Sequence, residues 1–122
     1  MFLKSLLPVC IGGAIGASLR YSVIHVVHLW TKSNFPLGTI VVNCIGCFLI
    51  GILWMFLESH ESPQWVKLLI ITGGLGAFTT FSTYAIDILF LIESQQFLPA
   101  FFYFTLSNGL GFLCLYLGRV FL

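Results

Sequence analysis

One stretch of the chain concentrates the residue types that could bind an ion. Between Gly73 and Tyr84 the sequence combines three glycines with hydroxyl side chains and aromatic rings. Phe81 and Tyr84 are three residues apart and would share a helix face, with Thr80 and Thr83 on a row beside them. Glycines weaken a helix, and an unwound turn frees carbonyl oxygens that suit a small hard cation. Aromatic ring edges are electropositive and can face an anion, although an aromatic stripe by itself more often only packs.

Two further pairs of polar residues lie in otherwise apolar runs. Thr39 and Asn43 are four residues apart and share a helix face with Gly46. The Asn43 amide has two N–H donors that an anion could use. An interhelical hydrogen bond that only fixes packing is the alternative, and helix geometry alone favours it. Tyr103 and Ser107 show the same spacing near the end of the chain and can face one partner.

Arg20 is a permanent cation within the first apolar run. A charge at that depth needs a partner, water or an anion. Its long side chain could instead reach the membrane interface, so both interpretations stay open.

The composition defines the medium in which these residues work. The 122 residues are 59% hydrophobic and only 7% charged, whereas about a quarter of the residues in a soluble domain are charged. Four apolar runs are each long enough to cross a bilayer as a helix. We therefore predict an all-α integral membrane protein with one four-span domain over residues 1–122, whose third helix is broken at mid-membrane. The runs are Leu6–Leu29, Leu37–Leu57, Val66–Ile92 and Leu98–Leu122.

The charges flanking these runs leave the orientation in the membrane poorly specified. Lys4, Lys67 and Arg119 fall on one side, and Lys32 and Arg20 fall on or near the other. A bias of three against two is close to none under the positive-inside rule. Either the orientation is weakly set, or the chain inserts both ways and pairs antiparallel with itself.

The sequence does not indicate an enzyme or a nucleic-acid-binding protein. The four acidic residues form no set with a nucleophile and a base. Gly74-x-Gly76 follows no strand and lacks the lysine of a phosphate-binding loop. Cys44 and Cys47 match a redox spacing, but on an apolar helix such cysteines are usually small packing residues.

Over all four runs the chain resembles the Fluc (CrcB) family of fluoride channels. The resemblance implies a fluoride-selective passive channel that exports cytoplasmic fluoride across the plasma membrane and so relieves its toxicity. It also implies an antiparallel, dual-topology homodimer with two pores. The motifs that carry it are Gly12-Gly13…Gly16-Ala17…Leu19-Arg20-Tyr21, Pro36-Leu37-Gly38-Thr39…Asn43…Gly46…Phe48…Gly51 and Thr79-Thr80-Phe81-Ser82-Thr83.

The resemblance also implies roles for individual residues. Arg20 matches a position near a pore entrance, and the backbone carbonyls of Gly76 and Thr79 match those that hold a structural sodium ion at the dimer centre. No other cofactor is implied. The implied fluoride path comprises Asn43, Phe81, Ser82, Thr83, Tyr84, Thr39, Tyr103 and Ser107.

This chain departs from the family pattern at several positions. Tyr84 stands where the family usually has Phe, so Tyr84→Phe is expected to preserve or raise the flux. Asp87 stands where Glu is usual, and beyond Ser107 the polar track either ends early or uses Asn108. Pairing with a non-identical subunit therefore stays open.

Two other classes of protein were weighed against the channel. A small dual-topology transporter needs a membrane-embedded carboxylate, typically in the first span, and that run has none. A purely structural membrane subunit would not need hydroxyls, Asn43 and a glycine-rich break at one depth.

Overall fold

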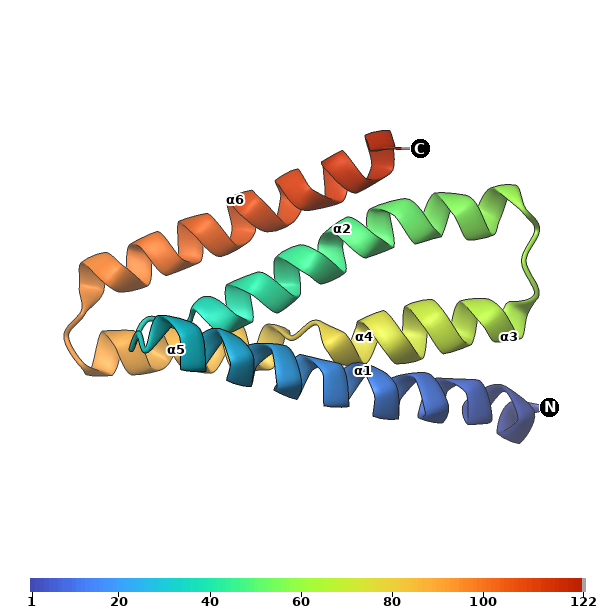
Figure 1. The fold of residues 1–122 in the computed structure, drawn as a ribbon, viewed down its shortest axis with the longest axis horizontal. Helices are drawn as coiled ribbons and strands as arrows, with labels where there is room; N and C mark the ends of the chain where they lie inside the picture. Colours follow the sequence, from blue (N-terminus) through green and yellow to red (C-terminus); the bar gives the residue numbers. More distant parts are fainter. Residues whose placement is uncertain (122) are drawn as a thin grey trace.

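The third membrane span is interrupted, and the helices around it form an antiparallel bundle. The computed structural model describes residues 1–121, which form four helical spans and no strand. Successive spans run in opposite directions, so both termini lie at the same end (Figure 1). The spans are α1 (Phe2–Thr31), α2 (Leu37–Ser59), an interrupted third span (Gln64–Glu93) and α6 (Phe97–Phe121).

These bounds confirm the four predicted spans to within a few residues. Residue 122, with which the predicted fourth run ended, lies outside the described residues. Each of the three connections contains one polar residue with a positive φ: Lys32 at 48°, Glu61 at 46° and Gln95 at 57°. That left-handed conformation reverses the chain, and side chains of this kind are well solvated at a membrane surface.

The third span consists of four short helical segments with one extended step between the last two. The break is at Thr79 (φ −79°, ψ 159°) and Thr80 (φ −150°, ψ 124°). The break therefore follows the glycines, whereas the sequence suggested a break at the glycine-rich stretch itself. Gly73 and Gly74 stay helical in a widened π-helix, and Gly76 begins the next α-helical segment. The segments are α3 (Gln64–Lys67), the π-helix η1 (Leu68–Leu75), α4 (Gly76–Phe78) and α5 (Phe81–Glu93).

The glycines of α1 explain how the broken span is held. A Cβ added at Gly16 would meet the carbonyl oxygen of Gly74, and one added at Gly12 would meet that of Leu69. The backbones of α1 and η1 therefore touch directly, as small residues permit between membrane helices. The small-residue face of α1 is thus used inside one chain. The other close pair of spans is α2 and α6, which lie side by side (Figure 1).

This contact predicts that alanine substitution lowers the stability at one glycine of α1 and leaves it unchanged at another. Gly16→Ala places a methyl group against backbone that cannot yield, and overpacking of this kind costs about 1–3 kcal/mol. Gly13→Ala is the matched control, because nothing lies within 4 Å of its added Cβ. Thermal unfolding of the detergent-purified variants measures both. Equal melting temperatures for the two variants would contradict this packing.

Candidate functional site

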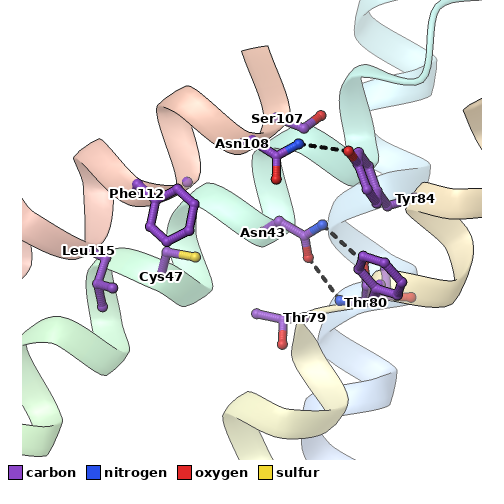
Figure 2. A pocket seen from close by; sticks show the side chains of 11 residues that line it. Asn43, Cys47, Thr79, Thr80, Tyr84, Ser107, Asn108, Phe112 and Leu115 are labelled. Atoms are coloured by element: carbon purple, nitrogen blue, oxygen red, sulfur yellow. Dashed lines mark hydrogen bonds between the residues drawn. The ribbon is translucent and has the colours of Figure 1, made fainter. Parts of the chain in front are cut away.

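The Asn43 side chain of α2 bonds to the broken backbone of the third span. The backbone N–H of Thr80 donates to Asn43 Oδ1 at 2.8 Å, and Asn43 Nδ2 donates to the carbonyl of Thr80 at 3.0 Å (Figure 2). An N–H can only donate and a carbonyl can only accept, so these partners fix the orientation of the amide. One N–H of Asn43 remains for another acceptor. The interhelical hydrogen bond that helix geometry favoured is therefore present, and it leaves a donor over.

This pairing changes the bonding of the backbone on both sides of the break. In a continuous helix the Thr80 N–H would bond to the carbonyl of Gly76, four residues earlier. Here it donates to Asn43 instead, and that carbonyl loses its helical partner. The Thr80 hydroxyl then caps α5 by accepting from the N–H of Thr83 at 3.1 Å. The break thus leaves carbonyls at the end of α4 and begins a new, capped helix.

Arg20 lies against this break. Its guanidinium donates to the carbonyl of Thr79 at 3.4 Å, across 59 positions of sequence. A cation is favourable there, because carbonyls without helical partners form the negative end of a helix. Snorkelling to the interface is therefore not needed to explain Arg20. The carbonyl oxygens of Gly76 and Thr79 are the groups at this break that could hold a cation, because a carbonyl oxygen is an acceptor with two lone pairs.

A cavity of about 280 Å³ lies beside the break, between α2, the third span and α6. Phe81 lies at the rim of this cavity, and its side chain is 79% exposed. None of the lining residues within the described part of the chain carries a charge. The lining residues are Asn43, Cys47, Thr79, Thr80, Phe81, Tyr84, Ser107, Asn108, Gly111, Phe112 and Leu115, most of which appear in Figure 2.

Two residues that line this neutral cavity carry hydrogen-bonding groups without partners in the described part of the chain. The Ser107 hydroxyl is buried and has no partner among residues 1–121. The second N–H of Asn43 is also uncommitted. Buried polar groups almost always find a partner, so a lone hydroxyl of this kind indicates a partner that residues 1–121 do not supply. The arrangement can replace part of the hydration shell of a small anion without binding it through a full positive charge.

The aromatic rings form a row past this cavity. The ring centroids of Phe81 and Tyr84 are 5.6 Å apart, and those of Tyr84 and Tyr103 are 5.5 Å apart. Phe78, which has the same spacing before Phe81, is buried elsewhere, because the extended step at Thr79 resets the helical phase. The row therefore continues into the fourth span rather than back along the third.

Asp87 collects two of the predicted path residues at the far end of this row. The hydroxyls of Thr39 and Tyr103 each donate to Asp87 Oδ2 at 2.8 Å. Both donors are buried, and each is committed to the carboxylate. Their bonds to Asp87 fix the end of the aromatic row at Tyr103, and neither residue lines the cavity.

The structure thus divides the eight predicted path residues into two groups. The cavity lining contains Asn43, Phe81, Tyr84 and Ser107, whereas Thr39, Ser82, Thr83 and Tyr103 lie outside it. Ser82 is exposed on the first turn of α5, and the Thr83 hydroxyl accepts from Thr80 at 3.1 Å.

Two residues of the site were absent from the predicted set. Thr80 is central because of its backbone, which no side-chain pattern reports. Asn108 donates to the Tyr84 hydroxyl at 2.7 Å. A polar residue in the middle of an apolar span was the available signal for Asn108. From the sequence, Asn108 was expected only as a possible extension of the polar track.

Comparison with known proteins shows the family to which the chain belongs. Residues 7–119 match the model of a family described as CrcB-like protein, Camphor Resistance (CrcB). A protein of Hydrogenobaculum sp. (strain Y04AAS1) is 45% identical over 93% of both chains. One of Magnetococcus marinus is 42% identical over 92% of both, and one of Flavobacterium psychrophilum is 34% identical over 97% of this chain and 96% of its own. All three are named fluoride-specific ion channel FluC, which is the name of an ion channel and not of an enzyme.

The family match covers all four spans. Each of these relatives is more than one third identical to this chain over nearly its whole length. The chain is therefore a multi-pass membrane protein that belongs to the CrcB family.

Proposed function

We propose that this protein is a passive, fluoride-selective channel of the plasma membrane that lets cytoplasmic fluoride leave the cell. The observation that carries the proposal is the neutral cavity lined by residues whose donors find no acceptor among residues 1–121, chiefly the buried hydroxyl of Ser107. The names of the relatives identify the anion as fluoride.

Fluoride is small and holds its water tightly, so a pore must offer several hydrogen-bond donors in exchange. The free N–H of Asn43 and the hydroxyl of Ser107 supply donors, and the Phe81 ring supplies an electropositive edge. Binding must also be weak enough for the ion to leave, and a site without a fixed cation meets that condition. Larger anions carry a more diffuse charge and gain less from the same donors.

Passive export needs no energy source in this setting. Hydrogen fluoride is a weak acid that crosses membranes in its neutral form and releases fluoride in a less acidic cytoplasm. The membrane potential, negative inside, then drives the anion outward through any selective leak. The first span supplies no carboxylate that could couple transport to protons.

The proposed function predicts distinct effects of Ser107→Ala on flux and on stability. Removing a donor to an ion should lower fluoride flux by at least about tenfold, since such bonds are worth about 1.5–3 kcal/mol. Removing a buried, unpartnered hydroxyl should leave the melting temperature unchanged or raise it. Efflux from proteoliposomes, read with a fluoride electrode and repeated with chloride, measures the first effect. A wild-type protein that releases neither ion, or chloride as readily as fluoride, would falsify the proposal.

A second variant in the same assay separates ring chemistry from packing. Phe81→Ile keeps an apolar side chain but removes the ring edge, and the ring is too exposed to be a core element of the single chain. Flux should collapse while the purified protein remains folded. Asn43→Leu is less informative, because it also leaves both backbone groups of Thr80 without partners.

We further propose that two copies of the chain assemble as an antiparallel homodimer. Phe81, Ser82 and Asn108 are exposed in the single chain, although they lie along membrane spans. Polar groups at that depth need protein around them, and a second copy would cover them. The nearly balanced flanking charges would allow insertion in both orientations.

Antiparallel assembly predicts that both termini are found on both sides of the membrane. A single cysteine placed at the C-terminus of a variant without native cysteines should react with an impermeant maleimide in about half of the copies in intact cells. Permeabilised cells give the total. Labelling of nearly all or nearly none of the copies would exclude dual topology.

We also propose that a sodium ion at the centre of this dimer is held by the carbonyls of Gly76 and Thr79 of both copies. The lost helical partner of the Gly76 carbonyl supports this, as does the second lone pair of the Thr79 carbonyl beside Arg20. A cation there would balance carbonyl dipoles buried at the interface.

Replacing sodium by a bulky organic cation should therefore lower both the fluoride flux and the fraction of protein that stays dimeric in detergent. Potassium at the same ionic strength is the control for general salt effects. Full flux and an intact dimer after thorough removal of sodium would contradict a structural role for the ion.

A further inference from the structure

The amide of Asn108 has one possible orientation in this structure. Asn108 Nδ2 lies 2.7 Å from the backbone carbonyl of Phe104 and 2.7 Å from the hydroxyl oxygen of Tyr84. A carbonyl can only accept, so the atom between these two groups must be the nitrogen. Its two hydrogens serve the two oxygens.

This orientation of the Asn108 amide restricts the direction of the Tyr84 O–H bond. The hydroxyl oxygen accepts from Asn108, so its own hydrogen must be directed away from that amide (Figure 2). Among residues 1–121 no acceptor for that hydrogen is found, although Tyr84 is only 7% exposed and lines the cavity. Accepting one hydrogen bond also polarises a hydroxyl and makes it a better donor.

We propose that the Tyr84 hydroxyl is a donor to the transported anion and that Asn108 is the positioning residue that directs its hydrogen into the cavity. This inference rests on the proposed function. It assigns the role to the O–H group, which phenylalanine lacks, rather than to the ring edge that both residues share. The hydroxyl joins the free N–H of Asn43 and the hydroxyl of Ser107 as a third uncommitted donor of the same cavity.

Tyr84→Phe tests the donor, because it removes the O–H and keeps the ring. The fluoride dissociation constant is obtained from the rise in melting temperature of the detergent-purified protein across a fluoride titration, with chloride as the control. We expect the constant to increase about tenfold, the loss of one hydrogen bond to an ion.

Asn108→Leu tests the positioning role. The Tyr84 hydroxyl is then free to turn, so the dissociation constant should rise by a smaller factor, about threefold. In a Tyr84→Phe background the same substitution should have no further effect, because its only route to the ion has gone. Tyr116→Phe is the matched control for Tyr84→Phe, because it removes a tyrosine hydroxyl outside the cavity. Tyr116 lies on α6, as Asn108 does, and its side chain is 64% exposed.

The outcomes separate this inference from the proposed function. A wild-type protein that neither binds nor releases fluoride overturns the function itself. A wild-type channel whose Tyr84→Phe variant binds fluoride equally well overturns only the donor. An Asn108→Leu effect that persists undiminished without the Tyr84 hydroxyl overturns the positioning role.

Discussion

The reciprocal pair of hydrogen bonds between Asn43 and the backbone of Thr80 is the interaction on which the rest of this structure depends. A break inside a bilayer leaves backbone groups without water, and each unsatisfied group costs several kcal/mol. Asn43 satisfies the N–H and the carbonyl of one residue at once, as a neighbouring strand would. Without Asn43, the N–H and the carbonyl of Thr80 would both lose the partners that they have in this structure.

The same interaction separates two electrostatic environments within one turn of chain. On one side, the end of α4 presents carbonyl oxygens, and the guanidinium of Arg20 lies against them. On the other side, a neutral cavity is lined by Asn43, which keeps a free N–H, and by Ser107, whose buried hydroxyl has no partner among residues 1–121. Carbonyls attract cations and donors attract anions, so one distorted segment offers a place for each. A regular helix offers neither, because its backbone groups are bonded to one another.

Asp87, the carboxylate that contacts the end of the aromatic row, does not line the cavity. Asp87 accepts from the buried hydroxyls of Thr39 and Tyr103, and its charge is directed at them. Tyr103 in turn packs against the ring of Tyr84. A negative charge is thereby placed behind the row, where it stabilises the packing of three spans without lining the cavity that an anion would occupy.

Composition and periodicity by themselves determined the membrane setting, the four spans and the presence of a break in the third, because each follows from apolar length and local chain stiffness. The motif pattern also singled out Asn43, Phe81, Tyr84 and Ser107, all of which line the cavity. Only the tertiary structure decided that the break falls at Thr79 and Thr80, after the glycines. A hydrogen bond from another helix stabilises that position, and local propensity does not record such a partner. The direction of each hydrogen-bond donor was also decided by the tertiary structure. A sequence allows a polar side chain many partners, and only the fold places particular groups within reach of it.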